Sequence, residues 1–248
     1  MIELKTEAEI EKMRVAAQIV ARALDLIGEQ IRPGITTGEL DEIADGFIRS
    51  KGAVPAFLGY QDYPKSICVS IDDEVVHGIP SRKRVIRKGQ IVSVDIGSLI
   101  DGFNGDSART FAVGDIPEES RRLLDVTSQS LRDGIAKARA GNRLGDISNA
   151  VQVRAEGAGF SVVRDLVGHG IGRAMHEEPQ IPNYGSPGTG VLLKAGMVLA
   201  IEPMVNAGGY NVKTKPDGWT IVTADGSLSA HFEHTIAVTE AEPEVLTE

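Results

Sequence analysis

Cysteine and aromatic residues are scarce in this chain of 248 residues, which has one cysteine and 4% aromatic residues. One cysteine cannot form an intrachain disulfide, so the fold does not depend on an oxidising compartment. No apolar run approaches the ~20 residues that span a bilayer. The first residues also lack the basic start and the apolar stretch of a signal peptide. We therefore expect a cytoplasmic protein without a membrane partner.

Positive charge is in deficit as well, because 26 lysine and arginine residues face 35 aspartate and glutamate residues, a net charge of −9. Proteins that bind nucleic acids usually carry a basic surface that neutralises phosphates, so this balance argues against a DNA partner. The chain has no Gly-x-Ser-x-Gly elbow, no phosphate-binding loop, no Cys-x-x-Cys pair and no His-Glu-x-x-His helix. These absences exclude the commonest signatures of nucleophilic, nucleotide-dependent and thiol chemistry.

Four segments carry the signals of helices. Thr6 and Glu9 have the spacing of a capping box, and apolar residues then recur every three or four positions until Pro33-Gly34. A second helix is expected from about residue 38 to residue 52. A third is expected after Asp115, which precedes Pro117 and could cap it, and a fourth over about residues 146–156.

Short apolar runs over residues 90–96 and 197–202, each introduced by a glycine, suit strands buried in a sheet, and residues 229–238 form a further strand candidate. The chain also repeats itself at an offset of 107 residues, because Gly34-x-x-x-Gly38 recurs as Gly141-x-x-x-Gly145. We infer an α+β fold in which a helix–helix–sheet unit is duplicated. The halves, about 1–114 and 115–248, are expected to form a single domain, since no flexible linker separates them.

Two carboxylates interrupt the apolar strands at equivalent places of the repeat, since Asp95 and Glu202 are also 107 residues apart. A buried carboxylate costs several kcal/mol unless it is paired or bound to a metal. Each could instead point outward or pair with an arginine, but two such residues in register favour a shared function.

The dipeptide Asp101-Gly102 predicts a two-residue hairpin turn. In that hairpin Asp95 faces Ala108 and Gly97 faces Asp106, so the two aspartates are diagonal neighbours on one face. Across such a diagonal, roughly 7–8 Å between backbones, both carboxylates can reach one ion.

The second half supplies matching donors. Glu233 lies on the strand candidate that could run beside Glu202, and His169 lies between glycines in Gly168-His169-Gly170-Ile171-Gly172. Four carboxylates and one imidazole are the donors that a pair of divalent cations requires, and such pairs occur in aminopeptidases. The residues alone therefore predict a dinuclear metal centre.

The motifs come in the order of a known family. The chain resembles type I methionine aminopeptidase nearly end to end, through Tyr60-x-x-Tyr63-Pro64-Lys65-Ser66-Ile67-Cys68, His77-Gly78-Ile79-Pro80, Asp95, Gly105-Asp106, the glycine-flanked His169, His176-Glu177-Glu178-Pro179, Ile201-Glu202-Pro203 and Phe232-Glu233-His234-Thr235. The resemblance implies the pita-bread fold, in which two pseudo-symmetric α/β halves surround an antiparallel sheet. It also implies removal of N-terminal methionine from new proteins and peptides whose second residue is small.

The resemblance implies roles for individual residues. Asp106 and Glu233 would bridge two divalent ions, His169 and Glu202 would complete one ion, and Asp95 would chelate the other. Glu202 would also move the proton of the attacking water. His77 and His176 would contact the substrate amide and the tetrahedral intermediate. The pocket for the methionine side chain would be formed by Tyr60, Tyr63, Cys68 and Trp219, with Phe57 and Met175 at its variable positions.

Further implications concern ions and partners. The divalent metal could be Co, Mn, Fe(II) or Zn, and Asp72, Glu74 and Ser229 align with a monovalent-cation site of some members. His231 lies one step from a ligand position, and its role stays open. We expect a monomer that acts on nascent N-termini, and docking to the ribosome is left open. The alternatives are a proline-specific aminopeptidase or dipeptidase of the same fold and a catalytically inactive binding homologue.

Overall fold

The computed structural model describes residues 2–248, and its first two helices begin at capping boxes. Helix α1 (Glu7–Gln30) is capped by Thr6, whose side chain accepts from the backbone of Glu9 while the Glu9 carboxylate accepts from the backbone of Thr6. This confirms the predicted start. Helix α2 (Thr37–Ser50) begins slightly earlier than predicted, because Thr36 and Glu39 form a second capping box there.

The other two helices depart from the prediction at their first turns. Helix α3 (Glu118–Ile135) has Pro117 as its N-cap residue and no capping side chain, so the predicted Asp115 cap is wrong. Asp115 instead pairs with Lys88 at 2.8 Å. Helix α4 (Leu144–Gly157) starts before residue 146, because Asp146 occupies its third position and accepts a hydrogen bond from the backbone of Arg143.

The sheet of the first half contains the predicted hairpin. Strands β1 (Val54–Pro55), β4 (Ile91–Ile100) and β2 (Ile67–Ile71) lie in that order, and β5 (Phe103–Ala112) pairs with β4. Asp101 and Gly102 both have positive φ, as the tight turn requires. The register places Asp95 opposite Ala108 and Gly97 opposite Asp106, which confirms the prediction.

The second half supplies most strands of the remaining sheets. Strands β15 (Glu244–Val245), β14 (His234–Ala237), β9 (Val198–Ile201), β7 (Gly168–Gly170) and β8 (Glu177–Ile181) form one of them. A second contains β13 (Ser229–His231), β10 (Met204–Asn206) and β6 (Ser161–Val162), and a third contains β11 (Val212–Thr214), β12 (Ile221–Thr223) and β3 (Glu74–Val76). A single 3₁₀ turn, Tyr60–Asp62, precedes β2.

The predicted strand over residues 229–238 is wrong in one respect, because it is two strands with different partners. Strand β13 pairs with β10, whereas β14 pairs with β9. Between them the backbone N–H of Glu233 donates to the carbonyl of Ala108 in β5 at 2.9 Å. This bond takes the chain across to the first half and brings Glu233 beside the β4–β5 hairpin.

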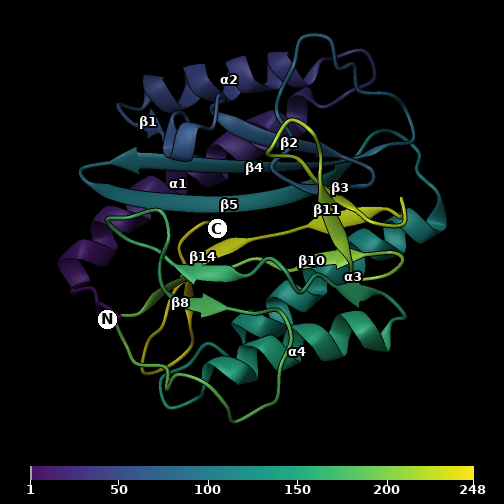
Figure 1. The fold of residues 1–248 in the computed structure, drawn as a ribbon. Helices are drawn as coiled ribbons and strands as arrows, with labels where there is room; N and C mark the ends of the chain where they lie inside the picture. Colours follow the sequence, from purple (N-terminus) through teal and green to yellow (C-terminus); the bar gives the residue numbers. More distant parts are fainter. Residues whose placement is uncertain (1) are drawn as a thin grey trace.

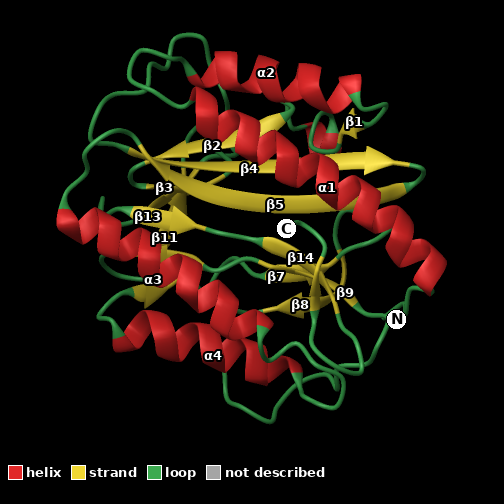
Figure 2. Ribbon diagram, turned by 180° about the vertical axis from the view of Figure 1, so that it is seen from behind, coloured by secondary structure: helices red, strands yellow, loops and turns green. Residues whose placement is uncertain are grey.

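The sheets lie between two helical layers, α1 and α2 on one side and α3 and α4 on the other (Figures 1 and 2). The repeat is visible in the backbone: isolated bridges join Thr36 to Val85 and Arg143 to Leu192, two pairs separated by the same 107 residues. The architecture is therefore the expected α+β pita-bread fold with pseudo-symmetric halves. Among residues 2–248, no helix combines the length and the apolar character needed to cross a bilayer.

Candidate metal centre

A cavity of about 250 Å³ collects the predicted donors from both halves of the chain. All five predicted metal-ligating residues line it: Asp95, Asp106, His169, Glu202 and Glu233. Seven of the eight predicted substrate-contacting residues line it as well: Phe57, Tyr60, Tyr63, Cys68, His77, His176 and Trp219. Residues scattered over more than half of the sequence thus share one site.

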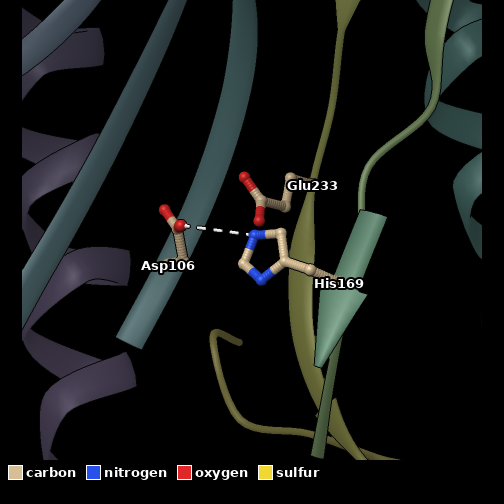
Figure 3. A group of neighbouring side chains, drawn as sticks. All are labelled: Asp106, His169 and Glu233. Atoms are coloured by element: carbon tan, nitrogen blue, oxygen red, sulfur yellow. Dashed lines mark ion pairs between the residues drawn. The ribbon is translucent and has the colours of Figure 1, made fainter. Parts of the chain in front are cut away.

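The donors approach one another from separate segments. Asp106 of β5, His169 of β7 and Glu233, between β13 and β14, offer ligand atoms that all lie within 4.8 Å of one another (Figure 3). The Nε2 atom of His169 is 4.0 Å from Asp106 Oδ2 and 3.5 Å from Glu202 Oε1. These distances are longer than hydrogen bonds, so a cation has room between the side chains.

The His169 ring is oriented by its own neighbourhood. Its Nδ1 lies 2.9 Å from the carbonyl oxygen of Gly170, which can only accept, so Nδ1 carries the proton and Nε2 keeps its lone pair. Burial, with His176 nearby, lowers the pKa of His169 to about 3. The imidazole is therefore neutral at physiological pH, as a metal ligand must be.

The four carboxylates lie close together, Asp106 and Glu233 buried and Asp95 and Glu202 partly buried, and burial is the main cause of their raised pKa values. The pKa of Asp95 rises to about 6 and that of Glu202 to about 8, while those of Asp106 and Glu233 rise well above the ordinary range. Asp95 Oδ1, Asp106 Oδ1 and Glu233 Oε1 are buried without a hydrogen-bond partner in residues 2–248. Crowded carboxylates with unpartnered oxygens fit divalent cations, which would supply the missing charge and coordination.

His231 lies next to this group. Its side chain is buried, and its Nε2 atom is 3.5 Å from Glu202 Oε2 and has no hydrogen-bond partner in the described residues. Glu202 therefore has an imidazole nitrogen 3.5 Å from each of its two oxygens, His169 on one side and His231 on the other. The sequence placed His231 near the ligands but gave no sign of this contact.

Part of the cavity wall is aromatic. Tyr63 packs edge-on against Trp219 with ring centroids 5.0 Å apart, and His77 meets the same indole at 6.2 Å. Met175, the remaining predicted pocket residue, is buried in the adjoining core rather than on the cavity surface. Gln61, which the sequence did not single out, lines the cavity from a turn with positive φ, and an irregular turn of this kind has no signal in the sequence.

The predicted monovalent-cation residues have partners within the protein. The Asp72 carboxylate accepts from the backbone of Ile91 and the side chain of Gln90, and Glu74 pairs with two cationic side chains. The backbone N–H of Ser229 donates to the carbonyl of Asp72. The side-chain oxygens of Asp72 and Glu74 are thus already occupied.

Two repeated halves that enclose a carboxylate-rich, imidazole-containing cavity define a metallopeptidase of the pita-bread class. The chain belongs to metallopeptidase family M24, whose family model matches residues 11–240.

Individual relatives agree with this assignment. The methionine aminopeptidase of Clostridium acetobutylicum is 53% identical over 247 residues, which cover 100% of this chain and 99% of that protein. The crystal structure of methionine aminopeptidase from Thermotoga maritima superposes with a TM-score of 0.99 at 49% identity and covers 100% of both chains. Prolidase from Pyrococcus furiosus shares the fold alone, with a TM-score of 0.78, 24% identity and 65% of that chain covered. The predicted resemblance is confirmed.

Proposed function

We propose that this protein removes the N-terminal methionine from new proteins and peptides whose second residue is small. The observation that carries the proposal is the cavity that five metal-ligating side chains share with a wall of Tyr63, Cys68 and Trp219. Such a wall suits the flexible thioether of methionine. The full-length relatives named above are methionine aminopeptidases, which favours this substrate over the proline-specific alternative and over an inactive homologue.

The donor set supports two divalent cations. Asp106 and Glu233 would bridge the ions, His169 and Glu202 would hold one of them, and Asp95 would hold the other. When bound, divalent cations acidify a water molecule and polarise a peptide carbonyl. Carboxylates with one imidazole suit Mn, Fe(II), Co or Zn, and the affinity order alone does not decide which metal is used in the cell.

Glu202 is the proposed general base. Its carboxylate lies within the donor cluster that lines the cavity, where it is placed to accept the proton of the attacking water. Its two oxygens lie 3.5 Å from the Nε2 atoms of His169 and His231, within the donor cluster. The same carboxyl group then returns the proton to the nitrogen of the leaving amine.

His176 is suited to donate a hydrogen bond to the oxyanion of the tetrahedral intermediate. Its Nδ1 shares a hydrogen bond of 2.7 Å with the Tyr60 hydroxyl. When that hydroxyl donates, Nδ1 accepts and the ring proton is on Nε2. The ring packs on His169 with centroids 4.3 Å apart, which places it beside the metal-ligating group. His77, which packs against Trp219, would contact the substrate amide.

The proposal also covers the domain organisation, the oligomeric state, the location and the partners of the protein. We propose a single catalytic domain over residues 1–248, acting as a monomer in the cytoplasm on the N-termini of nascent chains, with docking to the ribosome left open. A monovalent cation near Asp72, Glu74 and Ser229 would depend on backbone oxygens, since the carboxylates of Asp72 and Glu74 are occupied.

The test is a comparison of Glu202→Gln with a matched control, Glu29→Gln, which changes an exposed glutamate of α1. We expect Glu202→Gln to fold and to release methionine from Met-Ala-Ser at least about 10³-fold more slowly, while the control matches the wild type. Dialysis against a chelator should abolish turnover and added divalent cation should restore it. Normal turnover by Glu202→Gln would refute its role, and faster cleavage of an Xaa-Pro peptide would favour the alternative substrate.

A further inference from the structure

Glu74 is a buried carboxylate outside the metal centre, and its charge is fully partnered. Its side chain is 2% exposed, with Oε1 2.7 Å from Lys215 Nζ and Oε2 2.5 Å from Arg84 Nη2. Oε2 also accepts the backbone N–H of Ile71 at 2.9 Å. Four segments therefore meet at one side chain: β3 itself, the end of β2, the loop that follows Pro80, and the β11–β12 hairpin.

The hairpin that contains Lys215 also contains Trp219, and the intervening turn holds the two in a fixed relation. The Lys215 N–H donates to the carbonyl of Thr220 at 2.8 Å. The Asp217 carboxylate accepts the N–H groups of Trp219 and Thr220, each at 2.9 Å, and the Thr220 hydroxyl. Because the turn is braced internally, a shift at Lys215 moves Trp219 with it.

The backbone attaches this hairpin to β3 and the residue before it by a short ladder. Strands β12 and β3 share two residue pairs with an irregularity between them, and the Thr223 N–H donates to the carbonyl of Asp73 at 2.9 Å. Such a short ladder determines the tilt of the hairpin less tightly than a long one would, and the ion pairs to Glu74 add a further constraint. The Glu74 side chain is 2% exposed, and those of Lys215 and Arg84 are 40% and 31% exposed. The tilt matters because Trp219 forms part of the cavity wall against Tyr63 and His77.

We propose that Glu74, through its ion pairs with Lys215 and Arg84, is a positioning residue that fixes the β11–β12 hairpin and thereby sets the place of Trp219 in the pocket for the substrate side chain. The inference rests on the proposed function for the identity of that pocket. Glu74 does not touch the reacting atoms. Loss of its ion pairs is therefore expected to weaken substrate binding, which raises KM. The chemical step, which sets kcat, should stay unchanged.

The experiment uses Lys215→Met, which keeps the apolar stem and removes the charge. Lys213→Met is the matched control, because Lys213 lies exposed on the same hairpin and bonds only to the carbonyl of Ala224. Lys215→Arg tests rescue by another cation. Trp219 is the only tryptophan of the chain, so acrylamide quenching of its fluorescence reports on this wall directly.

We expect Lys215→Met to raise the quenching constant of Trp219. We also expect it to raise KM for Met-Ala-Ser about tenfold, because losing a contact the size of one methylene group in an apolar pocket weakens substrate binding by about that factor. Its kcat should stay within about twofold of the wild type. Lys213→Met should match the wild type in both measurements, and Lys215→Arg should restore both. Glu74→Gln, which weakens both ion pairs, should exceed Lys215→Met in each if it folds.

Two results would overturn the proposal: equal quenching and KM in Lys215→Met and Lys213→Met, or a fall in kcat with KM unchanged. If the wild-type protein does not cleave methionyl peptides at all, the proposed function fails separately. The quenching comparison needs no turnover. It therefore still tests whether the Glu74–Lys215 ion pair holds the β11–β12 hairpin in place.

Discussion

Gly105 lies where strand β5 contacts helix α1. Replacing it with alanine is expected to shift β5 and thereby displace the neighbouring metal-ligating residue. An added Cβ would lie 2.6 Å from the backbone nitrogen of Ala17 and 2.7 Å from the carbonyl carbon of Ala16. Both atoms belong to the helix backbone, so no side-chain rotation relieves the clash, and β5 must move away from α1. Overpacking of this kind costs about 1–3 kcal/mol of folding free energy.

The displacement matters for function because Asp106 is the next residue on β5. A misplacement of about 1 Å in a catalytic group costs on the order of 10²-fold in rate. The assay is thermal unfolding of metal-free Gly105→Ala, calorimetric titration with Mn²⁺, and kcat/KM for Met-Ala-Ser. Gly46→Ala is the control, since an added Cβ there meets nothing within 4 Å in α2 and should stabilise the helix by up to about 1 kcal/mol. Wild-type stability, metal affinity and activity in Gly105→Ala would refute the reasoning.

Two further predictions follow from the electrostatics of the cavity. Burial raises the pKa of Glu202 to about 8 and those of Asp106 and Glu233 well above their ordinary values, so the metal-free site holds protons at neutral pH. Metal binding should release them, and the heat of binding should then depend on the ionisation enthalpy of the buffer; identical heats in Tris and phosphate would contradict this. Burial, with His231 and His176 nearby, lowers the pKa of His77 from its ordinary value of 6.5 to about 4. The folded state therefore binds a proton at this imidazole less readily than the unfolded state does, and folding stability is lost as pH falls from 6.5 towards 4. Urea unfolding of metal-free protein should show that His77→Gln loses about 2 kcal/mol less than the wild type between pH 7.5 and pH 4.5, and equal losses would be the contrary result.

The parts of the site that could be predicted are those fixed by local rules. A two-residue turn sets the register of both flanking strands, so Asp101-Gly102 determined that Asp95 and Asp106 share a face. The repeat added Glu202 as the counterpart of Asp95. Its offset recurs in the backbone bonds from Gly34 to Ile86 and from Gly141 to Leu193, which close equivalent turns.

The parts that could not be predicted depend on contacts between distant segments. The strand over residues 229–238 divides because the Glu233 N–H finds the carbonyl of Ala108, and no local pattern contains that partner. Asp115 has the residue type of a helix cap, but it lies two residues before the N-cap position, which Pro117 occupies, and its side chain pairs with Lys88 instead. Met175 has the character of a pocket residue, but packing buries it in the core beside the cavity.

The division of the donors between the halves makes metal binding depend on the whole fold. Asp95 and Asp106 belong to the β4–β5 hairpin, whereas His169 belongs to β7 and Glu202 directly follows β9. Glu233 lies in the second half and bonds through its backbone to β5 of the first, which brings its side chain next to Asp106. Neither half alone has the four carboxylates and the imidazole. Because the cations would bind only where both halves meet, their binding free energy stabilises the arrangement of the two halves as well as each donor.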